Sequence, residues 1–179
     1  MKLLFLDVDG VLNSHQSAHY YMQYMTDQNR SVREFCPVAC SNLNYLLTEY
    51  PDLRIVVSST WRLGMNIPQL EDLLKTEKFE QEKIGLPDRY KAHRMVGYKL
   101  PKAGILIEDR IIGITPKLNV HRGHEIQRWF DEVRLRGHDF VIVDDDSDMA
   151  HLSGYLFQTD AKVGPVSYTH LTLPTIYSV

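Results

Sequence analysis

The sequence predicts an α/β protein in which a parallel β-sheet is flanked by helices. Short apolar runs recur along the chain, and segments with the helical spacing of apolar residues separate them. Strands and helices that alternate in this way are typical of a parallel sheet covered on both faces. The chain has 179 residues, which is enough for one domain with a buried core.

Five apolar runs are the candidate strands. Runs of roughly four to eight residues, mostly apolar and bounded by polar ones, are typical of strands buried in a parallel sheet. The runs cover residues 2–9, 53–60, 110–115, 139–146 and 154–160. They predict that the sheet has five strands.

Three segments between these runs show helical spacing, namely residues 37–50, 68–74 and 123–135. Pro37 suits the first turn of its helix, since proline lacks the N–H that this turn leaves unpaired. Gly137 is expected to end the third helix as a C-terminal cap. Residues 84–108 are mixed and basic, and we expect loops and short strands there.

Composition limits the classes of function. The formal net charge is −3, so no global basic field attracts nucleic acid, although an enzyme acting on a strand end is still compatible. Cys36 and Cys40 are the only cysteines, and we expect two buried thiols in a reducing compartment. Asp7 and Asp9 interrupt the first apolar run, so it is neither a signal peptide nor a transmembrane segment. We therefore expect a cytoplasmic protein.

The C-terminal segment is unlike the rest of the chain. Residues 163–179 contain no charged side chain and show neither helical nor strand periodicity. Residues 166–179 resemble the in-frame translation of a transposase-end sequencing adaptor. We therefore expect one domain over residues 1–164, truncated at its C-terminus, followed by a non-native tail over residues 165–179.

Polar residues close three of the predicted strands. Asp7 and Asp9 close the first, residues 58–60 close the second, and the fourth ends in a cluster formed by Asp144, Asp145, Asp146 and Asp148. The carboxyl ends of parallel strands meet at one edge of a sheet, so these groups are expected to face a common crevice. Like charges about 4 Å apart repel by roughly 4 kcal/mol at an effective dielectric near 20. A hard cation such as Mg²⁺ would offset this repulsion, whereas a solvated turn or helix caps are the alternatives.

Three segments resemble motifs of the haloacid dehalogenase (HAD) superfamily. DVDGVLN at residues 7–13 is similar to the first motif, VVSST at 56–60 to the second, and VIVDDDSD at 141–148 to the fourth. Together with SSTWR and RGHEIQRWF, they resemble the HAD domain of Swiss-Army-knife RNA-repair proteins and their stand-alone relatives. The resemblance implies a Rossmann-like parallel sheet flanked by helices. It also implies a Mg²⁺-dependent phosphatase that acts through an aspartyl-phosphate.

The resemblance assigns roles to residues of the first two motifs. Asp7 would be the nucleophile that attacks phosphorus, and Asp9 would be the general acid and base. Ser59 or Thr60 would donate a hydroxyl hydrogen bond to a phosphoryl oxygen, and Ser58 competes for this role. The presence of Asp9 favours hydrolysis, because relatives without it tend not to be phosphatases.

The resemblance also implies a cation that stabilises the charge on the transferred phosphoryl group. Arg122 lies near the start of the helix that precedes the last acidic strand, where this cation is expected, and Lys117 is the rival. Arg62 is a further candidate for substrate binding, because a guanidinium binds phosphate and stacks on bases. Its neighbour Trp61 suits a core position equally well.

The resemblance implies a Mg²⁺ site between the first and fourth motifs. Its expected ligands are the Asp7 carboxylate, the Asp9 carbonyl and one aspartate of the cluster. Asp144 is favoured over Asp145 because it comes first after the apolar run. Asp148 has the spacing of a supporting acid that orients the cation, water or metal.

The expected substrate is a phosphorylated small molecule or a nucleic-acid end, with no membrane association and no stable partner. Residues 14–35 and 63–110 are expected to be small cap insertions, which leave the site open to polymer ends; residues 15–25 suggest a hydrophobic helix beside the site. Two other classes of protein are alternatives to the phosphatase. A receiver domain of two-component signalling has its phospho-accepting aspartate on a middle strand, which here ends in SST. A non-catalytic binding module would not need both Asp7 and Asp9.

Overall fold

The computed structural model describes residues 1–15, 35–75, 105–135, 139–162 and 164, which form a five-stranded, all-parallel sheet flanked by helices. The strands are β1 (Lys2–Leu6), β2 (Leu53–Val57), β3 (Ile111–Ile114), β4 (Phe140–Asp144) and β5 (Leu156–Gln158), and their order is β3-β2-β1-β4-β5. Each strand falls within one of the five predicted apolar runs. The predicted fold class is therefore confirmed.

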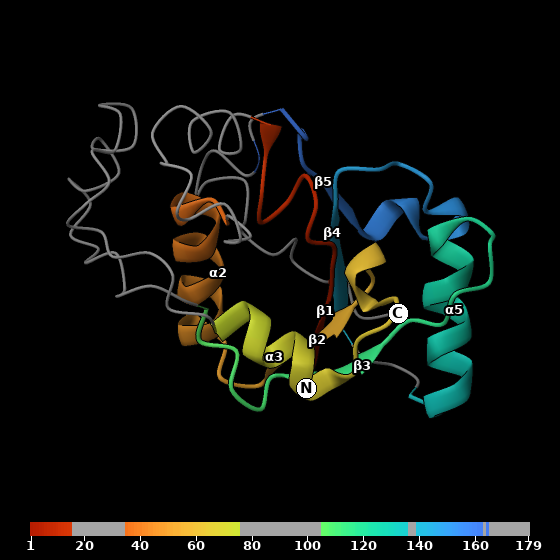
Figure 1. Cartoon of the computed structure of the whole chain (residues 1–179). Coiled ribbons are helices and arrows are strands. Elements are labelled where there is room, and N and C mark those ends of the chain that lie inside the picture. Colours follow the sequence, from red (N-terminus) through yellow and green to blue (C-terminus); the bar gives the residue numbers. More distant parts are fainter. Residues whose placement is uncertain (16–34, 76–104, 136–138, 163, 165–179) are drawn as a thin grey trace.

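The helices lie on both sides of this sheet. They are α2 (Pro37–Glu49), α3 (Ile67–Lys75) and α5 (Arg122–Val133), with the short 3₁₀ helices η2 (Thr60–Arg62) and η4 (Ala150–Tyr155). Figure 1 shows α2 and α3 on one side of the sheet and α5 on the other. The proline at the start of α2 occupies the first turn, as predicted.

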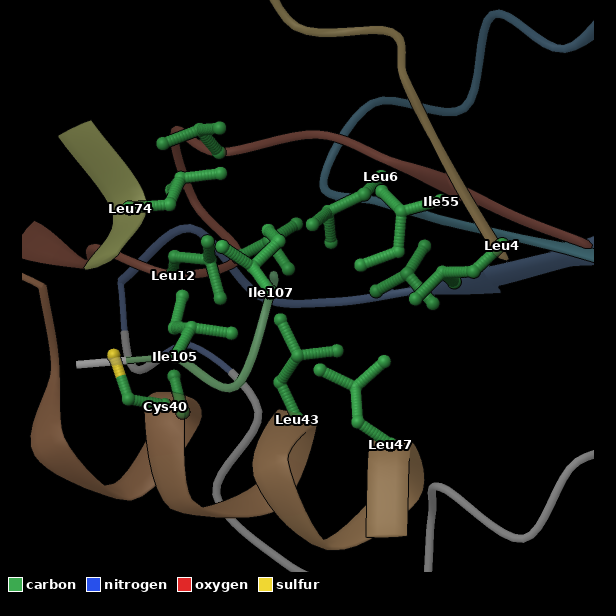
Figure 2. Close-up of a cluster of buried hydrophobic side chains, with 14 of the residues drawn as sticks. Leu4, Leu6, Leu12, Cys40, Leu43, Leu47, Ile55, Leu74, Ile105 and Ile107 are labelled. Carbon is green, nitrogen blue, oxygen red and sulfur yellow. The ribbon is translucent and has the colours of Figure 1, made fainter. Parts of the chain in front are cut away.

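The predicted helices differ from the observed ones by one or two residues at their ends. The third helix was expected to continue to residue 135, but α5 ends at Val133, because Arg134 adopts a left-handed conformation with φ 54°. Gly137, the expected cap, lies outside the described residues, as do most of the cap insertions and the tail over residues 165–179. Of the mixed segment 84–108 only residues 105–108 are described, and Ile105 and Ile107 are buried in the core (Figure 2).

The alternation of side chains along β1 builds a core on each face of the sheet, since successive residues of a strand point to opposite faces. Leu4 and Leu6 belong to the cluster that α2 covers, together with Leu47 of that helix (Figure 2). Phe5 belongs to the second cluster, where its ring centroid lies 5.5 Å from that of Trp129 on α5 in an edge-to-face arrangement. The sheet is therefore anchored to helices on both sides.

The strand order places a crevice between β1 and β4. The chain passes from β1 to β2 and β3 on one side and then returns to β4 and β5 on the other side of β1. At such a reversal the connections leave the sheet in opposite directions, and ligands bind beyond the carboxyl ends of the strands there. Asp7 follows β1 and Asp144 ends β4, so both carboxylates lie at this point.

The approach of α5 to the loop after β4 requires a glycine at position 123. A Cβ on Gly123 would lie 1.9 Å from the backbone oxygen of Met149. Because the obstacle is backbone, relief of the clash requires α5 to move. Gly154 in η4 is exposed, and a Cβ there would meet nothing within 4 Å.

We expect Gly123→Ala to lower the free energy of unfolding by about 3 kcal/mol, the scale of an overpacked site. The matched control Gly154→Ala should change it by less than about 0.5 kcal/mol. Urea denaturation followed by circular dichroism measures both values. Equal stability of the two variants would contradict the close approach of α5.

Candidate active site

Three strand ends meet at the crevice between β1 and β4. Asp7 directly follows β1, and its N–H donates a hydrogen bond to the carbonyl of Val143 on β4, at 3.0 Å. Ser58 follows β2, and its N–H donates to the carbonyl of Leu6 at the end of β1, also at 3.0 Å. Asp144 is the last residue of β4. Backbone hydrogen bonds thus continue the sheet by one residue and fix the positions of these side chains.

Three carboxylates come together at this edge. Asp7, Asp144 and Asp145 each offer an oxygen, and these oxygens all lie within 4.8 Å of one another. Asp7 and Asp144 are buried, whereas Asp145 is partly exposed. Burial raises the pKa of Asp7, and burial together with the charge of Asp7 raises the pKa of Asp144 to about 7.

Arg122 supplies the positive charge for this group. Its Nη1 lies 3.1 Å from Asp7 Oδ1 and 3.1 Å from Asp144 Oδ2, and it also donates to the carbonyl of Ser58. Burial alone would lower the pKa of Arg122, but Asp144 and Asp7 outweigh this effect and hold the pKa above its usual value. Lys117, the rival cation, is exposed and forms no ion pair with the described part of the chain.

Asp148 lies at the start of α5, beside the cation Arg122. Its Oδ2 accepts a hydrogen bond from the backbone N–H of Arg122 at 3.1 Å, so it caps the N-terminus of α5. It is not among the three carboxylates that converge. Of the roles expected for Asp148, which were to orient the cation, water or metal, the structure records a contact with the cation Arg122, and a role at the metal stays a prediction.

Asp146 lies outside the group of converging carboxylates. Its side chain is exposed, and its backbone N–H donates to Asp144 Oδ1 at 2.9 Å. This hydrogen bond turns the loop after β4 and orients the Asp144 carboxylate. The second oxygen, Asp144 Oδ2, is buried, and its contact with Arg122 Nη1 at 3.1 Å is an ion pair without the geometry of a hydrogen bond.

Asp9 lies at the same edge but in contact with solvent. Asn13 Nδ2 donates to its Oδ1 and Trp61 Nε1 donates to its Oδ2, each at 2.9 Å. The turn from Asp9 to Asn13 needs a glycine at position 10, where φ is 74°. A Cβ on Gly10 would lie 2.4 Å from the side chain of Asp145. The carboxylate of Asp9 is therefore held in place while it remains exposed.

The three candidate hydroxyls after β2 occupy different environments. Ser59 is buried, and hydrogen bonding from its side chain is among the effects that lower the pKa of Asp7. Ser58 is also buried, and its Oγ has no hydrogen-bond partner among the described residues. Thr60 is exposed and lines the cavity beside Asp9. Ser59 is thus the hydroxyl whose contact with the buried Asp7 the structure records.

Arg62 is the clearest departure from the sequence-based prediction. It is buried, and its Nε, Nη1 and Nη2 donate to four backbone carbonyls and to Glu125 Oε2, the last at 2.5 Å. A guanidinium has five N–H groups, so these contacts leave none for a phosphate or a base. The predicted substrate contact is therefore wrong, and Arg62 instead joins the ends of β2 and β3 to α5.

Glu125 completes this buried ion pair and was not predicted as a site residue. Its second oxygen accepts a hydrogen bond from the backbone N–H of Leu118 at 2.8 Å. The signal for it in the sequence is faint: an acid that lies beside the apolar Ile126, one turn after Arg122. Burial lowers the pKa of Arg62, and the charge of Glu125 opposes that shift. Each side chain is therefore needed to compensate the other.

A cavity of about 620 Å³ opens beside Asp9. Asp9, Asn13, Thr60 and Asp145 contribute polar groups to its lining, and the apolar part comes from Trp61, Leu63 and Met65. The volume lies within the range of small-molecule sites, roughly 300–1,000 Å³. The cavity thus offers both polar and apolar groups to a ligand.

A comparison with protein families identifies the family of this chain. The model of the family described as the HAD domain in Swiss Army Knife RNA repair proteins matches residues 3–165. No curated protein and no solved structure matches the chain. Within the described ranges, none of the helices has the length and apolar character needed to cross a membrane.

We expect Glu125→Ala to lower the free energy of unfolding by about 3–5 kcal/mol, because it leaves the buried Arg62 charge without its partner. The control is Glu132→Ala on the same helix, which removes an exposed pair with Arg128 that measures 2.8 Å. This change should amount to less than about 1 kcal/mol. Urea denaturation measures the free energy of unfolding of both variants. Similar losses in the two would show that the buried pair contributes no more to stability than the exposed one.

Proposed function

Because the chain belongs to the family of HAD domains found in Swiss Army Knife RNA repair proteins, and so to the HAD-type hydrolases, we propose that it is a Mg²⁺-dependent phosphatase. The proposed reaction forms an aspartyl-phosphate at Asp7 and then hydrolyses it. We further propose that its substrates carry the phosphate on a nucleotide or at a nucleic-acid end, in line with the description of the family. Cys36 and Cys40 are buried thiols that form no disulfide, in line with a reducing location such as the cytoplasm.

The observation that carries this proposal is the convergence of Asp7, Asp144 and Asp145 around one arginine. These residues fit Mg²⁺: their carboxylates supply hard oxygen ligands, and the buried Oδ2 of Asp144 accepts no hydrogen bond within the described structure, its contact with Arg122 being an ion pair only. The three carboxylates would hold the ion, and the Asp9 carbonyl remains a proposed ligand. When bound, Mg²⁺ would offset negative charge on the carboxylates and on the phosphoryl group.

Asp7 and Arg122 have the chemistry for the first step. In our proposal an Asp7 oxygen attacks phosphorus while the bond from phosphorus to the leaving oxygen breaks, and Asp9 gives its proton to that oxygen. Arg122 stabilises the charge on the phosphoryl oxygens, and Ser59 donates its hydroxyl hydrogen to one of them. The contact of 3.1 Å between Arg122 Nη1 and Asp7 Oδ1 keeps nucleophile and cation in register.

Asp9 serves the second step in the opposite sense. It takes a proton from a water molecule, which attacks phosphorus, and the bond between phosphorus and Asp7 breaks to release inorganic phosphate. After the two steps together, Asp7 and Asp9 are back in their starting states. The exposure of Asp9 suits this role, because an acid and base must exchange its proton with substrate and water.

Two other functions have less support from the site. A receiver-like signalling domain retains the phosphate on its aspartate and has no need of a general acid and base beside the cavity. A non-catalytic module with this fold has no need to bury a nucleophile against a cation. The positions of Asp9 at the cavity and Asp7 beside Arg122 favour turnover over both.

We expect Asp7→Asn to abolish phosphatase activity while the fold is retained, because the amide has nearly the same shape but is a poor nucleophile. Loss of a nucleophile reduces turnover on the order of 10⁴- to 10⁶-fold. Release of inorganic phosphate from p-nitrophenyl phosphate and from 3′- and 5′-phosphorylated oligonucleotides measures the effect. The exposed control Asp146→Asn should stay close to wild type, and turnover by Asp7→Asn at the wild-type rate would refute the assignment.

The metal proposal predicts how Mg²⁺ changes stability with pH. A carboxyl whose pKa is higher in the folded chain binds its proton more tightly there, so the stability that Asp144 contributes is complete below about pH 4 and is lost as the pH rises toward about 7. Mg²⁺ binds the ionised carboxylates and stabilises the folded state. We therefore expect Mg²⁺ to raise the melting temperature more at pH 8 than at pH 5.

Variants of the aspartate cluster identify the ligands in the same assay. Asp144→Asn should remove most of the stabilisation by Mg²⁺ at pH 8, and activity of the wild type should be lost in EDTA. Asp146→Asn should keep the stabilisation, because that side chain is exposed and lies outside the converging group. Equal responses of the two variants to Mg²⁺ would show that the ligand set is wrong.

A further inference from the structure

We infer that Trp61 is a positioning residue for Asp9: its indole N–H fixes the carboxylate that gives the leaving oxygen its proton. The inference deepens the proposed function and rests on it, because it presumes that Asp9 is the general acid and base. It adds a residue from η2, 52 positions along the chain, to the catalytic arrangement.

Two N–H donors determine the orientation of the Asp9 carboxylate. Trp61 Nε1 donates to Oδ2 and Asn13 Nδ2 donates to Oδ1, each at 2.9 Å. Asn13 is itself fixed, since its Oδ1 accepts the backbone N–H of Gly10 at 3.0 Å. An exposed aspartate without such donors would rotate among its rotamers. Each carboxylate oxygen keeps a second lone pair, so Asp9 can carry a proton while both hydrogen bonds persist.

The indole of Trp61 is a well-anchored donor. Its ring is partly buried against the core on the α2 side, and its centroid lies 5.6 Å from that of Phe35. Its backbone N–H donates to Ser59 Oγ at 3.3 Å, and the next residue is Arg62, which is locked by its buried hydrogen bonds. The indole therefore links Asp9 to the rigid end of β2. A core position alone would explain the packing of the ring, but not the direction of its N–H.

The cavity places Trp61 and Asp9 on a common wall. Both line the space of about 620 Å³, together with Leu63 and Met65. A leaving group in this cavity would meet the acid and the residue that holds it. The position of Trp61 also suits direct stacking of a substrate ring on the indole, and the experiment must separate this role from the positioning of Asp9.

Proton donation matters most when the leaving oxygen is a poor leaving group. As the bond from phosphorus to that oxygen breaks, the electron pair stays on the oxygen and the proton of Asp9 neutralises it, while the bond between Asp7 and phosphorus forms. An alkoxide needs this proton much more than a nitrophenolate, which is stable without it. General acid catalysis contributes on the order of 10²- to 10⁴-fold, and a misplaced acid loses part of that factor.

The experiment removes the N–H of Trp61 and keeps its ring. One variant is Trp61→Phe, and in a second the residue is replaced by β-(3-benzothienyl)alanine, in which sulfur takes the place of the indole N–H. We expect kcat/KM, which reports the step that forms the aspartyl-phosphate and releases the leaving oxygen, to fall about 10-fold for a simple alkyl phosphate and less than about 3-fold for p-nitrophenyl phosphate. The control Trp129→Phe, in the core on the other face of the sheet, should lower both rates by the same factor.

Each other result has a defined meaning. Equal losses of kcat/KM for both substrates would overturn the inference, and so would activity unchanged from wild type in the two variants. A larger loss of kcat/KM for p-nitrophenyl phosphate, whose ring can stack on the indole, would overturn it in favour of a ring that only binds substrate. A wild-type protein that hydrolyses neither phosphate would instead refute the proposed function, so the two failures are distinguishable.

Discussion

The crevice between β1 and β4 must hold two buried carboxylates, Asp7 and Asp144, and the rest of the site follows from the need to offset their charge. Arg122 neutralises one of them, and with Asp145 in the group two negative charges remain uncompensated, which is the charge of one divalent cation. Arg122 can reach both carboxylates because α5 begins directly beside them. The N-terminus of α5 is fixed by Asp148, whose carboxylate accepts the Arg122 N–H. The need to offset the charge of these carboxylates thus accounts for the position of the N-terminus of α5.

The buried ion pair of Arg62 and Glu125 holds the end of β2 next to α5. Arg62 binds the carbonyls of Ser58 and Ser59, and Glu125 lies one helical turn after Arg122. The carbonyl of Ser58 accepts hydrogen bonds from both arginines, so the end of β2 is held between them. A charged pair in such a place adds little net stability compared with a well-packed apolar one, but its loss on one side is severe. The pair instead contributes orientation, because hydrogen bonds are directional and apolar contacts are not. These hydrogen bonds fix the end of β2 and α5 relative to each other.

The sequence predicts the fold well because the physics of buried parallel strands is local. Each apolar run is continuous, so the five strands are visible without tertiary information, although their ends are not: β1 stops at Leu6, and the acids that follow belong to the loops. Proximity of Asp7 and Asp144 also follows from topology, since parallel strands end at the same edge. The role of Arg62 is not predictable in this way, because its partner Glu125 lies 63 residues away and no local pattern encodes the pairing. The same limit applies to the contact of Trp61 with Asp9.

Two aspartates of one motif, Asp7 and Asp9, receive opposite environments, and this difference suits the two roles proposed for them. Burial raises the pKa of Asp7, so an ionised nucleophile there depends on Arg122 and on the metal that we propose. Asp9 must exchange a proton with a leaving group and with water, and burial would obstruct that exchange. Hydrogen bonds from Asn13 and Trp61 resolve the difficulty, because they orient the carboxylate without removing it from solvent. Two carboxylates with different surroundings can thus divide the chemistry between them, which is the general way in which one site provides both a nucleophile and an acid.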